Sequence, residues 1–177
     1  MPGVLKPTGF FDPLGLSKKA DEATMKRYRE AEVTHGRVAM LGALGFIVGE
    51  RVEGSTFLFD SQIRGPAISH LQQIPVDSQW IILLLVASIA GAEFYRANNF
   101  WVPPEDAKFD NPGQLNDDYV PGDLKFDPLG FKPSDPAKLF TMQTRELQNG
   151  RLAMLATAGF MAQELTDGKG IFEHLGY

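Results

Sequence analysis

The 177-residue chain has no cysteine and only three histidines, at positions 35, 70 and 174. The lack of cysteine excludes disulfides, thiolate-bound zinc, iron–sulfur clusters and cysteine nucleophiles, and so few histidines argue against a multi-histidine metal site. Positive charge is scarce as well: 17 Lys and Arg stand against 22 Asp and Glu, and no basic run occurs. Because phosphate binding needs clustered cations, nucleic acid is not an expected partner.

The amino-terminal segment, MPGVLKPTGFFDPLG, matches neither common type of targeting signal. It lacks the basic region and apolar core of a secretory signal, and it lacks the Arg- and Ser-rich composition of an amphipathic leader. We therefore expect either a chain that needs no targeting or a mature form. The apolar fraction of 44% is ordinary for a soluble protein, so composition alone does not indicate a membrane.

Three segments are predicted to be helices of an all-α protein with one domain, residues 1–177. The first covers about residues 18–52, with Ser17 as a candidate cap. The second covers about residues 76–98 and contains the most apolar run, WIILLLVASIAGA. The third covers about residues 136–166, with Ser134 or Asp135 as its cap and Pro136 at the first helical position.

The lengths of these segments suit a membrane protein. At about 1.5 Å per residue the first helix would be about 50 Å long, whereas the hydrocarbon core of a bilayer is about 30 Å thick, so its first turns would stand outside. Residues 101–136 are rich in Pro and Asp and show no periodicity, which predicts an extended surface connection. Residues 167–177 form a short terminal segment.

The first and third predicted helices carry an internal repeat. Aligning residues 31–50 with residues 145–164 gives nine identities in twenty, and the loop FDPLG precedes each copy. With three transmembrane helices, the two copies would cross the membrane in the same direction, so a two-fold axis along the membrane normal could relate them. A soluble helical array with a duplicated motif is the alternative.

Each copy places ionisable residues at the start of an apolar stretch. Twelve uncharged residues separate Arg37 from Glu50, and another twelve separate Arg151 from Glu164. Twelve helical residues extend only about 18 Å, so a membrane span would bring these charges to the edge of the bilayer core or inside it. Each unpaired charge would cost roughly 2.5 to 3.5 kcal/mol. The pattern therefore predicts that they have partners.

Helical geometry indicates those partners. Glu32 and Arg37 are five residues apart, about 140° around the helix, so the arginine points away from its own glutamate. If the two repeat helices cross near the two-fold axis, Arg37 pairs with Glu146 and Arg151 pairs with Glu32. Small residues would permit the close approach of the backbones: Gly36, Ala39, Gly42, Gly45 and Gly49 on the first helix, and Gly150, Ala153, Ala156 and Gly159 on the second.

These ion pairs leave acceptor groups unused on apolar faces. The carboxylates keep lone pairs, His35 offers a ring nitrogen, and Asn149 and Gln163 offer amide oxygens. Buried acceptors without partners are costly. The magnesium of a chlorin ring, carried by an apolar molecule, would accept such a ligand from one axial side. Ligands scattered singly along helices suit many separate pigments, whereas a free ion needs convergent ligands.

These residues resemble the light-harvesting chlorophyll-binding superfamily over nearly the whole chain. The segments GFFDPLGL, EVTHGRVAML, GDLKFDPLGF and RELQNGRLAML are similar to that family's loop and helix signatures, in the same order. The chain most resembles the chlorophyll a/c antennae of red-lineage algae, the fucoxanthin- or peridinin-type proteins, through its compact length and the segment MQTRELQNGRLAMLATAGFMAQELTDGKG.

The resemblance implies a set of pigment-binding residues and no metal other than the magnesium of chlorophyll. The implied axial ligands are Glu32, His35, Glu93, Glu146, Asn149, Gln163 and His174, with Arg37 and Arg151 as ion-pair partners. The two FDPLG loops would hold the end rings of two carotenoids, through Phe11, Asp12, Pro13, Leu14, Phe126, Asp127, Pro128 and Leu129.

His174 departs from the family pattern within this set, and His70 lies outside the set. Green-plant relatives place a histidine about one turn beyond the position of His174, so a ligand and a non-ligand are both open there. His70 lies in the connection between the first two predicted helices and is expected to be a solvated loop residue.

The resemblance implies a light-harvesting antenna and not an enzyme. It would bind chlorophyll a, chlorophyll c and xanthophylls such as fucoxanthin, peridinin or diadinoxanthin, and would pass excitation to a photosystem core, I or II. Neighbouring antenna proteins and thylakoid lipids are further expected partners. A photoprotective member of the family is the alternative. It would dissipate excitation when lumen-side carboxylates are protonated, with Glu50, Glu53 and Glu164 as candidates.

An enzyme or transporter could also use intramembrane Glu, His and Arg to relay protons. The symmetric use of both repeat copies in ion pairs argues against that class. The resemblance implies a multi-pass protein of the chloroplast thylakoid membrane, and the distribution of basic residues predicts that its amino terminus lies on the stromal side. Lys18, Lys19, Lys26, Arg27 and Arg29 precede the first span and Arg96 and Lys108 follow the second, whereas Arg51 and Arg64 lie on the other side.

Overall fold

The computed structural model describes residues 2–7, 9–55, 62–103, 105–106 and 113–176. Lys108, which entered the orientation argument, lies outside these residues. The fold is helical, as expected. Extended pairing in the described ranges is limited to two isolated bridges, Leu5 with Gly9 and Trp101 with Leu115.

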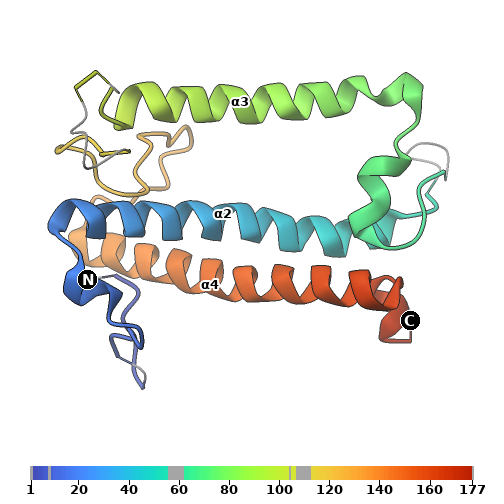
Figure 1. Cartoon of the computed structure of the whole chain (residues 1–177), viewed down its shortest axis with the longest axis horizontal. Helices are drawn as coiled ribbons and strands as arrows, with labels where there is room; N and C mark the ends of the chain where they lie inside the picture. Colours follow the sequence, from blue (N-terminus) through green and yellow to red (C-terminus); the bar gives the residue numbers. More distant parts are fainter. Residues whose placement is uncertain (1, 8, 56–61, 104, 107–112, 177) are drawn as a thin grey trace. The chain divides into compact units, whose positions relative to one another are not determined.

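Three long helices dominate the chain (Figure 1). Their bounds are α2 (Glu22–Val52), α3 (Trp80–Phe100) and α4 (Pro136–Asp167). Short elements accompany them: α1 (Leu16–Lys19), α5 (Ile171–His174) and the 3-10 helices η2 (Ala67–Gln73) and η3 (Val76–Ser78).

The first predicted helix is interrupted, which corrects both its start and its cap. Residues Ala20 and Asp21 separate α1 from α2. Asp21 caps α2, because its side chain accepts a hydrogen bond from the Thr24 amide at 2.9 Å. Ser17 lies inside α1 and donates its hydroxyl to Asp12 instead.

The ends of α4 follow the signals in the sequence. Asp135 accepts a hydrogen bond from the Ala137 amide at 3.2 Å, and Pro136 takes the first helical position. After Asp167 comes Gly168, whose φ of 65 lies in the left-handed region that closes many helices. Of the two proposed caps, Asp135 therefore serves as the cap.

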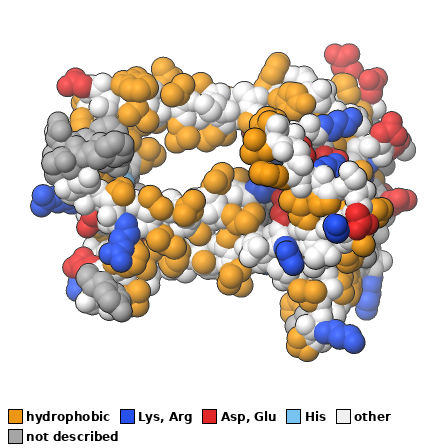
Figure 2. All heavy atoms as spheres, turned by 180° about the vertical axis from the view of Figure 1, so that it is seen from behind, with side chains coloured by type: hydrophobic (Ala, Val, Ile, Leu, Met, Phe, Trp, Pro, Cys, Tyr) orange, Lys and Arg blue, Asp and Glu red, His pale blue; other side chains and the backbone are white. Residues whose placement is uncertain are grey.

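Two segments of the described chain are long and apolar enough to cross a membrane, Glu22–Val52 and Val76–Phe100. Only 11% of the most apolar window of the first is buried, and none of that of the second. A core helix of a soluble protein would bury such side chains. Figure 2 shows apolar side chains spread along the exposed surface of α3. These exposed faces favour contact with lipid or with an apolar ligand.

The chain divides into two compact units, and the division cuts each long helix once. Unit 1 comprises Met1–His35 and Ile89–Asn149, and unit 2 comprises Gly36–Ser88 and Gly150–Tyr177. Each unit is described by itself below.

In unit 1, the connection after α3 folds back onto that helix. Phe100, Leu115 and Tyr119 form a buried cluster, in which the rings of Phe100 and Tyr119 stack at 4.6 Å. Gly113, with a φ of 80, lies against Trp101, and a Cβ there would come within 2.8 Å of the indole ring. Residues 113–124 are therefore not an extended surface connection throughout, because Leu115, Tyr119 and Leu124 pack in this cluster, although residues 117, 118 and 120 are exposed.

In unit 2, the second halves of α2 and α4 touch through glycine (Figure 1). A Cβ on Gly150 would lie 2.9 Å from the Cα of Gly36, so the two backbones are in contact. The Thr157 hydroxyl donates to the Ala39 carbonyl at 3.1 Å. The predicted close approach holds at Gly36 and Gly150. It does not extend to Gly45 or Gly159, where a Cβ would meet no described atom within 4 Å.

Candidate functional site

The two FDPLG loops have the same local structure. Asp12 accepts hydrogen bonds from the amides of Leu16 and Ser17, at 3.0 and 2.9 Å. Asp127 accepts them from the two equivalent amides, those of Phe131 and Lys132, both at 2.9 Å. The apolar side chains of both loops stand out from the protein: Phe11 is 77% exposed, Leu14 80%, Phe126 81% and Leu129 73%. Two similar loops thus present similar apolar surfaces.

His35 lies on an exposed face of α2 in unit 1. Its Nδ1 is 2.7 Å from the Ala31 carbonyl oxygen. A carbonyl can only accept, so Nδ1 is the donor, and in the neutral imidazole Nε2 then keeps its lone pair. Histidine ligands of metals commonly have this arrangement, with one ring nitrogen donating to a carbonyl and the other binding the metal.

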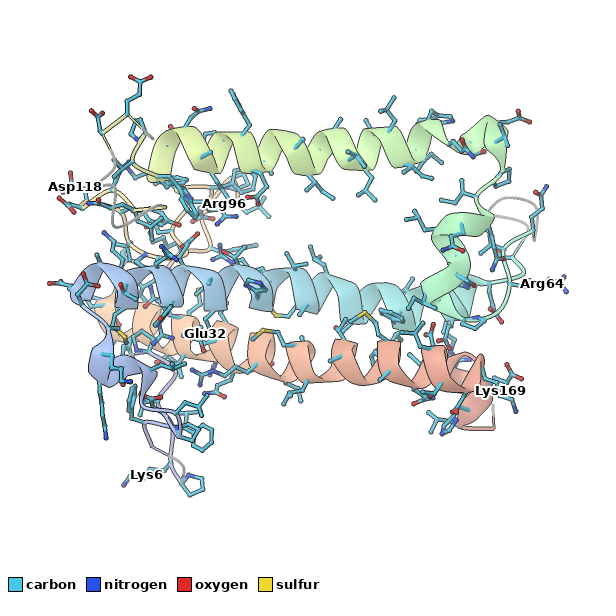
Figure 3. The ribbon with its side chains drawn as sticks, in the orientation of Figure 1. Lys6, Glu32, Arg64, Arg96, Asp118 and Lys169 are labelled. Carbon is cyan, nitrogen blue, oxygen red and sulfur yellow. The ribbon has the colours of Figure 1, made fainter. Side chains whose placement is uncertain are left out.

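Glu93 lies on α3, and its side chain is 59% exposed. Both of its carboxylate oxygens accept hydrogen bonds from Nη1 of Arg96, at 2.7 and 2.8 Å. Each oxygen has two lone pairs, so acceptor capacity remains on the exposed side. Figure 3 shows Arg96 directed from α3 towards the first half of α2.

The two expected ligands in unit 2 also have suitable surroundings. The side-chain nitrogen of Gln163 is buried and has no hydrogen-bond partner among the described residues. Rotation of the amide would bring its oxygen, a possible ligand, to the same place. Nδ1 of His174 is 2.9 Å from a carboxylate oxygen of Asp167, which leaves Nε2 facing away.

The remaining expected ligands lie on the first halves of α2 and α4. Glu32, which Figure 3 labels, forms an ion pair with Arg29 at 2.8 Å that the sequence pattern did not indicate. Glu146 is half-buried and Asn149 is exposed. The pairs of Arg37 with Glu146 and of Arg151 with Glu32 join residues of different units, and they stay predictions.

Sequence reasoning missed Glu30, which is 4% exposed and accepts several hydrogen bonds. Its carboxylate accepts hydrogen bonds from the Tyr119 hydroxyl at 2.9 Å and from the Gly122 amide at 2.8 Å. Nη2 of Arg96 donates to it at 2.8 Å. Glu30 therefore joins α2 to α3 and to the connection that follows α3.

The equivalent position of the second copy is Thr144, which also holds a Pro-Gly turn. The Gly3 amide donates to the Thr144 hydroxyl at 3.4 Å, and the Gln148 side chain donates to the Gly3 carbonyl at 3.0 Å. Gly3 and Gly122 both have a φ of 84. The signal that could have revealed this pair is the repeated pattern Pro-Gly-x-Leu-Lys, at residues 2–6 and 121–125.

Unit 2 contains two buried carboxylates, Glu50 at 8% and Glu164 at 2% exposure. Glu50 accepts hydrogen bonds from the amides of Ile171 and Phe172 at the start of α5, at 2.8 and 3.0 Å. Glu164 accepts one from the Ile68 amide in η2, at 2.8 Å. Each repeat helix thus uses a buried glutamate near its end to hold a short helix.

His70 is not the solvated loop residue that we expected. It lies in η2 with its side chain 15% exposed. Its Nε2 is 2.8 Å from the Gly65 carbonyl oxygen and 3.8 Å from a carboxylate oxygen of Glu53. A cavity of about 320 Å³ beside it is lined by Gly42, Gly45, Phe46, Gly49, Ala67 and His70.

The donor set fits separate chlorophylls better than a free metal ion. No group of three or more His, Asp and Glu converges on one point within the described ranges. Single ligands such as His35 and Glu93 instead stand on exposed helix faces beside apolar side chains. A large ring with one axial position on its magnesium would suit this arrangement.

Comparison with known proteins shows the family. A family model described as "Chlorophyll A-B binding protein" matches residues 1–165. Light-harvesting complex stress-related protein 1 of Chlamydomonas reinhardtii is 51% identical over 178 residues, which cover 99% of this chain and 68% of that protein. Stress-related protein 3.2 of the same alga is also 51% identical, with 99% and 66% covered.

A third relative is the fucoxanthin-chlorophyll a-c binding protein of Isochrysis galbana, 46% identical over 170 residues, with 95% of this chain and 77% of that protein covered. The chain spans about two thirds of the length of the two stress-related relatives. These relatives are chloroplast proteins by name. The chain belongs to the chlorophyll a/b-binding family of light-harvesting proteins.

Proposed function

We propose that this chain binds chlorophylls and carotenoids in the thylakoid membrane and dissipates their excitation as heat when the lumen becomes acidic. The observation that carries this proposal is the pair of buried carboxylates in unit 2, Glu50 and Glu164, each of which holds the start of a short helix. Relatives of 51% identity that are named stress-related support dissipation over light harvesting.

The two carboxylates suit a switch because backbone amides donate hydrogen bonds to both of them. A charged acceptor makes a hydrogen bond roughly twice as strong as a neutral one, so protonation would weaken the hold on η2 and α5. Glu164 also lies near Glu50 and His70. Further charged or titratable groups around α5 are Arg51, Glu53, Glu173 and the pair of His174 with Asp167. The Arg51 guanidinium lies 4.5 Å from the centre of the Phe172 ring.

The chlorophyll ligands would be Glu32, His35, Glu93, Glu146, Asn149, Gln163 and His174. Each of these side chains would hold the magnesium of one chlorophyll, which when bound would supply the light absorption. The free Nε2 of His35 and the exposed carboxylate of Glu93 support these assignments. The FDPLG loops would hold the end rings of two carotenoids, because their exposed Phe and Leu side chains offer matched apolar surfaces.

In this proposal α4 is a third transmembrane helix, and the amino terminus lies on the stromal side. Reciprocal ion pairs of Arg37 with Glu146 and of Arg151 with Glu32 would neutralise the charges of both repeat helices within the membrane. Chlorophyll a, chlorophyll c and a xanthophyll such as fucoxanthin are the proposed pigments. They are supported by the 46% identity to a fucoxanthin-chlorophyll a-c binding protein.

A photosystem core, neighbouring antenna proteins and thylakoid lipids are the proposed partners. The function is the positioning of pigments, so the chain would not act as an enzyme. Light harvesting is the competing function within the same family.

Fluorescence lifetimes of the purified pigment-bound protein at about pH 5 and about pH 7.5 test the proposal. We expect a shorter lifetime at the lower pH. Because Gln resembles a protonated Glu, the variant with both Glu50→Gln and Glu164→Gln should have the short lifetime at both values. A long lifetime that does not change with pH would reject dissipation and favour light harvesting.

The matched control is Glu53→Gln. Glu53 lies in the same unit, but its side chain is 39% exposed, and its carboxylate accepts a hydrogen bond from the Gly65 amide at 2.9 Å. This variant should keep the pH response of the unmodified protein. If it lost the response as completely as the double variant, a general surface-charge effect would explain the data better.

A further inference from the structure

We propose that Glu30 is a positioning residue for the chlorophyll at Glu93: its buried carboxylate, clamped by Tyr119 and Gly122, fixes Arg96, and Arg96 in turn fixes the carboxylate of Glu93. This inference rests on the proposed function, because it assumes that Glu93 binds a pigment. All five residues belong to unit 1.

The first step is the geometry of Arg96. Its side chain is 13% exposed, with Nη2 donating to Glu30 at 2.8 Å and Nη1 donating to both oxygens of Glu93. The guanidinium is planar and rigid. Once Glu30 holds Nη2, the direction of Nη1 is fixed. The Glu93 carboxylate that accepts from Nη1 is therefore fixed as well. An exposed glutamate on an isolated helix would otherwise sample several rotamers.

The second step is charge. Two carboxylates share one guanidinium, so Arg96 alone cannot neutralise both. Glu30 receives three further hydrogen bonds from neutral donors: the Tyr119 hydroxyl, the Gly122 amide and, at 3.5 Å, the Thr34 hydroxyl. Burial, followed by the hydrogen bond to Glu30, raises the pKa of Tyr119, so its hydroxyl remains a donor throughout the physiological range. This leaves part of the positive charge of Arg96 available to Glu93.

The third step is the second repeat copy, which separates positioning from simple docking. There Thr144 and Gln148 hold the Pro-Gly turn of Gly3. On α4 itself the turn is held by a hydroxyl and an amide without a carboxylate, while Arg29 of α2 donates to the Pro2 carbonyl at 3.2 Å. The carboxylate of Glu30 is an addition of the first copy, and it is the group that contacts Arg96.

The substitution Glu30→Thr uses this comparison, because it gives the first copy the residue that holds the turn in the second. We expect the purified pigment-bound protein to keep its helix content. Pigment chromatography should show that one chlorophyll site is only partly occupied. The difference absorption spectrum should match that of Glu93→Ala. The variant that combines Glu30→Thr with Glu93→Ala should lose no more pigment than Glu93→Ala alone.

Two further variants keep the proposal falsifiable. Tyr119→Phe removes one donor to Glu30 and should shift the same absorption band with little pigment loss. Thr144→Val removes the equivalent hydroxyl in the second copy and should leave that band unchanged.

The outcomes distinguish the positioning role of Glu30, a structural role of Glu30 and the assignment of Glu93 as a ligand. If Glu93→Ala removes a chlorophyll but Glu30→Thr leaves the spectrum of the unmodified protein, the positioning role is wrong and the pigment assignment survives. If Glu30→Thr removes several pigments and lowers the melting temperature, Glu30 is a structural residue only. If Glu93→Ala removes no pigment, the ligand assignment fails and this inference fails with it.

Discussion

Both units bury carboxylates, but the partners of these carboxylates differ. In unit 1, Glu30 faces the guanidinium of Arg96 as well as a hydroxyl and an amide. In unit 2, Glu50 and Glu164 hold the backbone amides of short helices. A neighbouring cation favours the charged form of a carboxylate more than neutral donors do. The same residue type thus serves as a fixed anchor in unit 1 and as a candidate switch in unit 2.

The largest expected effect comes from removing the cation of unit 1. Arg96→Leu leaves Glu30, which is 4% exposed, without its charged partner. Removing one member of a buried ion pair costs about 3–5 kcal/mol. We expect a clear fall in the melting temperature of the pigment-bound protein, measured by circular dichroism, together with loss of pigment.

The matched control is Arg145→Leu, the same substitution at an exposed position of α4 in unit 1. Surface changes of this kind usually alter stability by less than about 0.5 kcal/mol. Equal melting temperatures for the two variants would show that Glu30 does not depend on its cation, and the contrast between the units would be lost.

An intermediate effect on the melting temperature is expected in unit 2, where α2 and α4 meet through backbone contact and not through charge. Gly150→Ala would place a methyl group 2.9 Å from the Cα of Gly36, and neither backbone can move aside without separating the helices. Overpacking of this kind costs roughly 1–3 kcal/mol. The melting temperature should fall, by less than for Arg96→Leu.

Gly159→Ala on the same helix is the control for that substitution. No described atom lies within 4 Å of its added methyl group, and Ala has the higher helix propensity, by up to about 1 kcal/mol. The melting temperature should therefore stay the same or rise. A fall as large as that for Gly150→Ala would mean that helix contact at Gly36 is not the reason for the loss.

The sequence predicted the parts that depend on periodicity and on the repeat. Those parts are the long helices, the cap at Asp135 and the glycine contact of Gly36 with Gly150. Glu30 was beyond that reasoning, since the best alignment of the copies begins at residue 31 and the residue equivalent to Glu30 is a threonine. A comparison by identity cannot detect a position where two copies perform the same docking with different chemistry.

The packing after α3 was hidden for another physical reason. Residues 113–124 have no periodicity, yet the stacked rings of Phe100 and Tyr119 fold them back onto the helix. Only that fold brings Tyr119 and Gly122 to Glu30. His70 was misjudged in the same way, because its burial depends on η2 and on the carbonyl of Gly65, neither of which local sequence reveals.

The smallest expected effect concerns the two FDPLG loops, where the copies agree. Hydrogen bonds lower the pKa of both aspartates: Asp12 chiefly through the Ser17 hydroxyl, and Asp127 chiefly through the Lys132 amide. A carboxyl with a lowered pKa stabilises its loop fully above the pKa of the unfolded chain, about 3.9. That stabilisation is lost as the pH falls through the lower, folded value. Acidifying the solubilised protein to about pH 5 should therefore leave both loops intact, in contrast to the carboxylates of unit 2.

Carbon-13 NMR of carboxyl-labelled aspartate in the detergent-solubilised protein would measure both pKa values, with Asp12→Asn and Asp127→Asn used to assign the two signals. Both should titrate below the ordinary range of aspartate, and each substitution should leave the other loop unaltered. If the pKa of either aspartate were at or above its ordinary value, that loop would lack the hydrogen bonds from backbone amides that the structure gives it. The two loops would then differ just where the structure makes them alike, and their exposed Phe and Leu side chains would no longer argue for two equivalent carotenoid sites.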